Sequence, residues 1–76
     1  MISDKKLLEL GFEQCIPIGS GVKKSINDVF EICKYNHDKY LRFQSIGSGF
    51  THQLKGIKNE DELKLFWFYM TGSKLT

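Results

Sequence analysis

The feature that most constrains this chain is an apolar segment near its C-terminus, from Leu63 to Met70, in which Lys64 is the one charged residue. At about 100° per residue, a helix over this segment carries apolar side chains on two opposite sides. One side is a stripe with helical spacing, formed by Leu63, Phe66, Trp67 and Met70. The other side is formed by Leu65, Phe68 and Tyr69. A helix in a two-layer domain buries one such stripe, so the second side needs another element of the chain, a second copy, or a foreign partner.

Capping residues predict a helix at each end of the chain. Ser3 is a suitable N-cap and Gly11 a suitable C-terminal stop for a short first helix. Asn59 and Glu62 form an Asn-x-x-Glu capping pattern at the start of the longer, apolar helix, and Gly72 ends it.

The segment between the helices reads as a series of antiparallel strands separated by turn residues. Alternation and turn composition predict strands over residues 12–18, 29–35, 40–46 and 50–57. In the first strand we expect Phe12, Ile16 and Ile18 on one face. Pro17 lacks a backbone donor, so this is expected to be an edge strand or a bulged one. In the last we expect Phe50 to point inward together with Leu54. The polar segment 23–28 is expected to be a loop or a ragged strand.

These elements predict one α+β domain over residues 1–76. We expect a small antiparallel meander of three to four strands, with the short N-terminal helix and the longer C-terminal helix on one face. The side of the long helix that carries Trp67 is expected on the sheet, and part of the opposite side under the first helix. One short helix can cover only some of that second side, so two alternatives stay open for the remainder: an exposed interface and complete packing inside the domain.

Composition and charge exclude several classes of protein. A chain with 41% hydrophobic residues is too rich in core formers for a disordered segment. The formal charge of +2 is too small to indicate a nucleic-acid partner by itself. The start of the chain lacks the apolar run of a signal peptide, and no stretch approaches membrane-spanning length. We therefore expect a cytosolic protein in which Cys15 and Cys33 are buried free thiols.

No pattern of catalytic or metal-binding residues occurs in the sequence. His37 lies in an expected turn and His52 in an expected strand without a local partner, and both read as surface histidines. The two cysteines and two histidines show none of the spacings of a zinc site. The sequence therefore predicts a non-enzymatic protein with no cofactor and no metal ion.

A second interpretation is a small module that binds single-stranded RNA. Residues 39–58 contain four basic residues and no acidic one. An aromatic residue and polar or basic groups on one sheet face are how several modules hold RNA. The residues expected to form this face are Tyr40, Arg42, Gln44, Lys55 and Lys58, with Thr51 and Gln53 alongside.

In size and texture the chain is similar to the small single-domain proteins, rich in Lys, Ile, Asn and Phe, that bacteriophages and prophages carry. The segments at residues 7–12 and at 59–63 leading to 70–72 resemble that type. Such proteins include the anti-CRISPRs, and the resemblance points to an inhibitor of a type VI, RNA-targeting nuclease. It implies stoichiometric binding to the nuclease or its guide complex, in a bacterial cell, without turnover.

The sequence thus predicts a protein that works by binding a macromolecule, most simply another protein. The residues expected at the partner are Leu65, Phe68 and Tyr69. The alternatives are the RNA-binding module described above and an accessory protein that forms homodimers through the same helix side.

Overall fold

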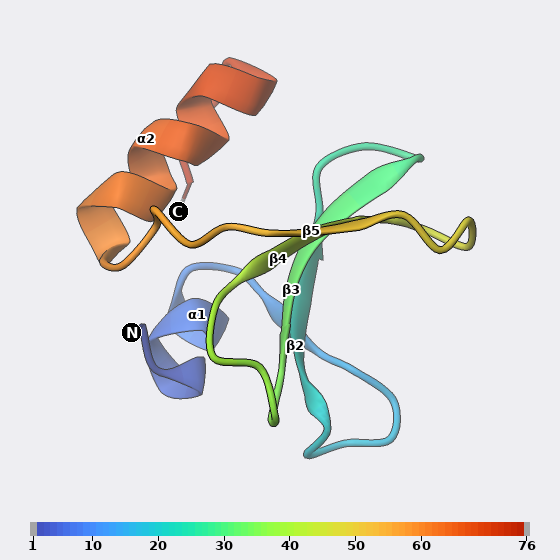
Figure 1. Ribbon diagram of the computed structural model, residues 1–76. Coiled ribbons are helices and arrows are strands. Elements are labelled where there is room, and N and C mark those ends of the chain that lie inside the picture. Colours follow the sequence, from blue (N-terminus) through green and yellow to red (C-terminus); the bar gives the residue numbers. More distant parts are fainter. Residues whose placement is uncertain (1, 76) are drawn as a thin grey trace.

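The computed structural model describes residues 2–75, which form two helices and one antiparallel sheet (Figure 1). The sheet is a meander in which each strand pairs with the next along the chain, in the order β1-β2-β3-β4-β5. The elements in chain order are α1 (Asp4–Glu9), β1 (Glu13–Gln14), β2 (Gly21–Ser25), β3 (Phe30–Tyr35), β4 (Arg42–Ser45), β5 (Thr51–Gln53) and α2 (Glu60–Thr71). The predicted α+β class and the helix at each end are confirmed.

The caps of both helices follow the sequence. The Ser3 hydroxyl accepts the backbone N–H of Lys6 at 3.1 Å, and the Asn59 side chain accepts that of Glu62 at 2.9 Å. Gly72 adopts a left-handed conformation with φ of 74° and ends α2, as glycine does at a helix C-terminus. These contacts satisfy backbone groups that a helix end leaves without partners.

The sheet has five strands rather than the expected three to four, because residues 21–25 form β2 in its interior. The prediction left residues 23–28 open between a loop and a ragged strand, and the structure shows a regular strand that begins two residues earlier. Lys24 lies on the helix side of the sheet, with its Nζ 5.4 Å from the centre of the Trp67 ring and 3.4 Å from the Gly11 carbonyl oxygen. A long lysine stem can line apolar surface while its ammonium group reaches a partner, so this lysine fits a covered face.

The expected strand over residues 12–18 is wrong beyond its first half. Phe12 is buried, but Ile16 and Ile18 are 92% and 82% exposed. Regular pairing covers only Glu13–Gln14, and the last bond to β2 runs from the Cys15 N–H to the Gly21 carbonyl oxygen at 2.9 Å. The chain then turns at Pro17, whose carbonyl oxygen accepts the Ser20 N–H. This turn carries both isoleucines away from the core.

The hydrophobic core lies between the sheet and the two helices, which cover the same face of the sheet (Figure 1). From α2 it takes Leu63 and Trp67, whereas Phe66 is half-buried and Met70 remains 45% exposed. The other fully or nearly buried apolar members are Ile2, Leu7, Leu10, Phe12, Val22, Ile32, Leu41, Ile57 and Leu75.

The second side of α2 is not covered by α1, contrary to expectation. The described contact between the helices is at the start of α2, where Lys6 lies 3.6 Å from the Glu60 carboxylate. The hydrogen bond from Lys64 and the charge of Lys6 hold the pKa of Glu60 below its ordinary value. The first helix therefore supports the N-terminal turn of α2 and leaves Leu65, Phe68 and Tyr69 in solvent.

Trp67 is the large side chain that joins α2 to the core, which leads to a stability prediction. Trp67→Ala should cost about 3–5 kcal/mol because it removes buried aromatic surface and leaves a cavity. Domains this small have on the order of 5 kcal/mol in total, so the variant should be largely unfolded by circular dichroism. Leu65→Ala, on the exposed side of the same helix, is the control and should melt close to the wild type. Near-native melting of Trp67→Ala would contradict the core assignment.

Candidate protein-binding surface

The outer face of α2, defined here as Leu65, Phe68 and Tyr69, is the most exposed cluster of large apolar side chains on this helix. These residues are 72%, 52% and 84% exposed. Their exposure follows from the helical period: Leu63 and Trp67 face the core, so the residues on roughly the opposite side of the helix face water. Aromatic side chains carry about 150–250 Å² each, so the face presents on the order of a few hundred Å² of apolar surface.

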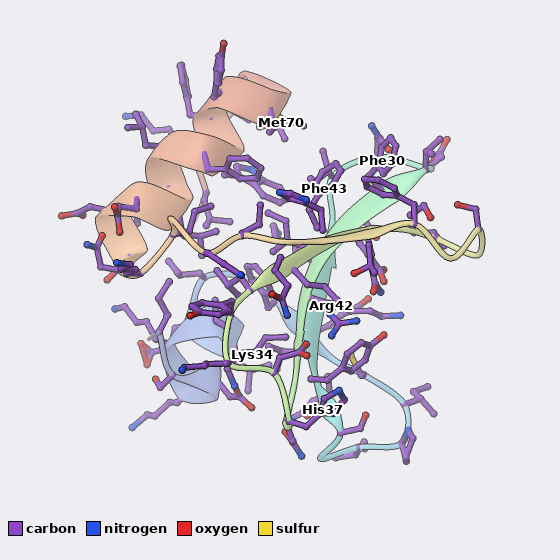
Figure 2. The ribbon with its side chains drawn as sticks, viewed as in Figure 1. Phe30, Lys34, His37, Arg42, Phe43 and Met70 are labelled. Carbon is purple, nitrogen blue, oxygen red and sulfur yellow. The ribbon has the colours of Figure 1, made fainter. Side chains whose placement is uncertain are left out.

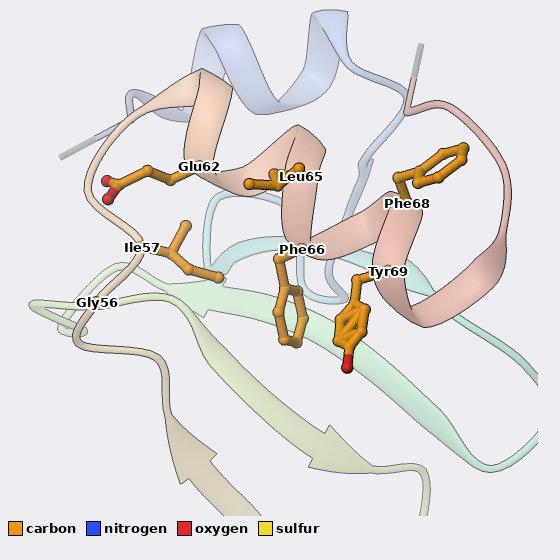
Figure 3. Close-up of a pocket in the computed structure, with 7 residues that line it drawn as sticks. All are labelled: Gly56, Ile57, Glu62, Leu65, Phe66, Phe68 and Tyr69. Atoms are coloured by element: carbon orange, nitrogen blue, oxygen red, sulfur yellow. The ribbon is translucent and has the colours of Figure 1, made fainter.

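Two grooves flank this face and make it a shaped surface. The first has a volume of about 700 Å³, and Figure 3 shows Phe66 and Tyr69, two of the residues that line it, pointing from α2 toward the sheet. Its lining is Gly56, Ile57, Glu62, Leu65, Phe66, Phe68 and Tyr69. The second groove, on the other side of the helix, is lined by Asp61, Lys64, Leu65, Phe68, Lys74 and Leu75. Leu65 and Phe68 line both grooves and form the ridge between them.

The apolar surface continues from α2 onto the strands. Phe43 packs face to face with Phe30, with ring centres 4.9 Å apart, and edge to face with Phe66 at 6.5 Å. Phe50 was expected to point inward; it is 52% exposed, although its ring lies 6.3 Å from that of Phe43. A third groove lies over these rings, below Met70 of α2 (Figure 2), and its lining is Phe43, Phe50, His52, Leu54, Phe66 and Met70.

The opposite face of the sheet carries part of the predicted RNA-binding set, in two groups. Arg42 and Gln44 lie side by side with Gln53 and Thr51, their cross-strand neighbours on β5. Tyr40 forms the second group, with the ammonium groups of Lys39 and Lys55 at 6.0 and 5.9 Å from the centre of its ring.

Lys58 is not part of this sheet face. It lines a shallow depression beside α1 with Ile2, Ser3, Lys6, Asn59 and Glu60. The structure therefore places Arg42 with Gln44 in one group and Tyr40 with Lys55 in another, and it places Lys58 next to the helices.

Two acidic residues that sequence reasoning left out lie beside Arg42 and Gln44: Glu31 on β3, and Asp38 in the connection between β3 and β4. Asp38, almost fully buried, receives a hydrogen bond from Arg42 at 2.5 Å. Gln44 donates to the Glu31 carboxylate at 2.6 Å and to the Tyr35 hydroxyl at 3.2 Å. The guanidinium of Arg42 also lies 5.4 Å from the Tyr35 ring. Arg42 and Gln44, two of the residues predicted to bind RNA, are thus engaged with acids of the same chain.

The buried thiols lie on this side of the sheet, as their cross-strand partners indicate. Cys33 pairs with Lys23 and Arg42, and Cys15 bonds to Gly21. Both cysteines are free and buried, as predicted. Burial raises the pKa of Cys33 to about 12, and the nearby Glu31 carboxylate adds to the shift. Burial also raises the pKa of Cys15.

Within residues 2–75, the structure places no three His, Cys, Asp or Glu residues close enough to hold a metal ion. In the same range, no helix has the length and apolar character needed to cross a membrane. His37 is exposed, with its ring 6.0 Å from that of Tyr35 and its Nε2 3.6 Å from the Asp38 carboxylate.

Comparison with known proteins gives no match to a family model, to a curated protein or to a solved structure.

The raised thiol pKa values predict slow alkylation of the native protein. The thiolate is the reactive form, and with a pKa of about 12 it amounts to roughly one part in ten thousand of Cys33 at pH 8. Mass spectrometry should therefore show little iodoacetamide adduct until guanidinium unfolds the chain. Ile18→Cys provides a matched exposed thiol, and equally fast labelling of Cys33 would contradict its burial.

The pair of Arg42 with Asp38 predicts a structural cost when the arginine is removed. Arg42→Ala leaves the Asp38 carboxylate buried with the backbone N–H of Tyr35 as its remaining described donor. An unsatisfied buried acceptor costs about 1–3 kcal/mol, which a urea titration would measure. Lys55→Ala, at an exposed site on the same face, should change stability by less than about 0.5 kcal/mol. Equal stability of the two variants would show that the pair is unimportant.

Proposed function

We propose that this protein is a non-enzymatic binding domain whose partner protein docks on the outer face of α2. The observation that carries the proposal is the exposure of Leu65, Phe68 and Tyr69 on a helix whose opposite side already fills the core. Contiguous apolar patches of a few hundred Å² on small proteins mark interaction sites. Tyrosine and other aromatic residues in such patches dominate the energetics of interfaces.

The shape of the surface supports a protein partner. The ridge of Leu65 and Phe68 stands between two grooves, and a partner can bury the ridge while filling both. A stable interface needs about 800 Å² from each partner, which is more than the α2 outer face supplies alone. Its extension over Phe66 to the groove beside Phe43 and Met70 brings the available surface closer to that size.

The specific version of this function is inhibition of a bacterial defence nuclease. It rests on the similarity in size and residue texture to phage-carried proteins, among them inhibitors of type VI, RNA-targeting nucleases. A domain of this kind acts by covering a working surface of the nuclease or of its guide complex. Inhibition is then stoichiometric and needs no catalytic group on the inhibitor.

RNA binding has weaker support from the sheet face. Arg42 and Gln44 are bound by Asp38 and Glu31, and these acids repel phosphate next to both residues. The pair of Tyr40 with Lys55 is the part of the face that retains an aromatic ring beside free basic groups. A second copy of the chain is the other candidate occupant, because Asp61 and Lys74 lie in one groove and offer opposite charges to a two-fold partner.

Serine substitutions on α2 test the proposed surface. Phe68→Ser and Tyr69→Ser should leave melting nearly unchanged because both side chains are largely exposed. Each should weaken partner binding by about tenfold or more, the effect of losing an interface anchor. Ile18→Ser removes an equally exposed apolar residue far from α2 in sequence and is the matched control. The partner is first captured from a bacterial host, purified, and then titrated by calorimetry.

The outcome of these titrations separates the three candidates. Loss of binding in the α2 variants with the control unaffected supports the proposed face. Full binding by Phe68→Ser together with Tyr69→Ser would reject it. Tight, salt-dependent binding of single-stranded RNA that needs Tyr40 and Arg42 would replace it with the RNA-binding module. A concentration-dependent dimer in sedimentation, abolished by Phe68→Ser, would assign the face to self-association. For the nuclease version, inhibition of a type VI effector should saturate at one inhibitor per complex.

A further inference from the structure

The free edge of β5 has unpaired backbone groups that point away from the sheet. Within residues 2–75, β5 is the last strand of the sheet and pairs with β4 alone. The Ser45 N–H donates to the Phe50 carbonyl oxygen at 3.0 Å, and the Leu54 N–H donates to that of Leu41 at 2.8 Å. Backbone groups alternate in direction along a strand, so Phe50, His52 and Leu54 point toward β4. The N–H and C=O of Thr51 and Gln53 therefore point outward.

The two sides of this edge have different chemistry. On the helix side, His52 is the β5 residue that borders the groove lined by Phe43, Phe50 and Met70. On the opposite side lie Thr51 and Gln53, with the ammonium group of Lys55 next to Tyr40. A strand added to this edge would place alternate side chains on these two sides. Apolar residues fit beside the aromatic groove, and acidic residues fit beside Lys55.

Charge determines which occupant this edge selects. The segment from Lys39 to Lys58 contains four basic residues and no acidic one, and one of them, Lys55, lies next to Thr51 and Gln53 of β5. The ammonium groups of Lys39 and Lys55 both lie against the Tyr40 ring on the same side of the sheet. A second copy would bring an identical basic edge against this one. Lysine beside an edge strand is a common device against such self-pairing. The same charge attracts an acidic chain, so the edge discriminates in favour of a foreign acidic segment.

We propose that the edge of β5 binds, by strand addition, an extended segment of a partner protein in which apolar and acidic residues alternate. Backbone hydrogen bonds to Thr51 and Gln53 supply the pairing, and the groove and Lys55 supply the side-chain preference. The inference rests on the proposed protein-binding function and adds the conformation and charge of the partner segment. The groove beside β5 shares Phe66 with the first groove on α2, so one partner can occupy both.

The test uses a synthetic eight-residue peptide that alternates valine and glutamate, titrated into the full chain by NMR at low salt. We expect the amide signals of Thr51 and Gln53 to shift and to gain protection from hydrogen exchange. A peptide with lysine in place of glutamate should bind at least tenfold more weakly. The valine–glutamate peptide methylated on its backbone nitrogens keeps its charge and side chains but cannot donate, and it should lose binding at least tenfold.

Variants of the protein locate the binding to the edge. Gln53→Pro removes an outward N–H that β4 does not use, and it should abolish peptide binding, whereas Gln53→Thr keeps the N–H and should bind. Lys55→Glu should reverse the preference from the glutamate peptide to the lysine peptide. Phe68 lines neither this groove nor the edge of β5, so the Phe68→Ser variant should bind the peptide as the wild type does. The proposal that a partner docks on α2 and the proposal that a strand adds to β5 can therefore be rejected independently of each other.

Four results would overturn the proposal. The first is equal binding of the methylated and unmethylated peptides, which would show attraction without strand addition. The second is absence of any shift at Thr51 and Gln53 at millimolar peptide. The third is tighter binding of a twelve-residue oligouridylate than of the acidic peptide, which would assign the edge to RNA. The fourth is pairing of β5 with a second copy, seen as a dimer that Gln53→Pro dissociates.

Discussion

The packing of Trp67 fixes which side of α2 meets the sheet, and the character of the exposed surface follows from that choice. Its ring is buried in the core, with the ammonium of Lys24 5.4 Å from its centre, and Leu63 one turn earlier is fully buried. A helix rotated by half a turn would bury Leu65 and Phe68 but would expose the largest side chain of the chain. Aromatic burial is worth several kcal/mol, so the observed rotation is the one that a small core can support.

This arrangement leaves one continuous apolar surface rather than scattered exposed residues. The ridge of Leu65 and Phe68, the ring of Tyr69 and the aromatic groups around Phe43 are linked by Phe66, which lines two of the three grooves. The edge of β5 borders the far end of this surface. A helix ridge, an aromatic groove and an open strand edge are three ways in which folded domains hold protein partners, and here they adjoin.

The surplus of apolar residues in 63–70 allowed both faces of α2 to be predicted, because a helical period assigns sides without knowledge of neighbours. The alternation of apolar and polar residues within a segment predicted neither the exposure of Ile16 and Ile18 nor a regular strand at β2. The exposure of the isoleucines depends on a turn at Pro17, and β2 depends on backbone pairing with both β1 and β3. The Lys24 ammonium also reaches the Gly11 carbonyl oxygen and the Trp67 ring. Such contacts join residues far apart in sequence, which alternation within a segment cannot report.

The candidate RNA-binding face of the sheet was also only partly predictable from the sequence. Cross-strand spacing correctly placed Arg42 and Gln44 beside Gln53 and Thr51, because register follows from a hairpin. Their neutralisation by Asp38 and Glu31 was not predicted. Asp38 stands four residues before Arg42, a spacing that could have signalled the pair, whereas Glu31 meets Gln44 only through the pairing of β3 with β4.

Site-specific photocrosslinking in bacterial cells tests the central claim, that a foreign protein covers the outer face of α2, most directly. A benzoylphenylalanine at position 69 reports on what touches α2, and one at position 18 reports on an equally exposed site on the β1–β2 connection. The account predicts a discrete crosslinked species from position 69 that contains a protein other than this chain, and none of the same species from position 18. Crosslinks from position 69 only to further copies of the chain, or an identical pattern from both positions, would contradict it.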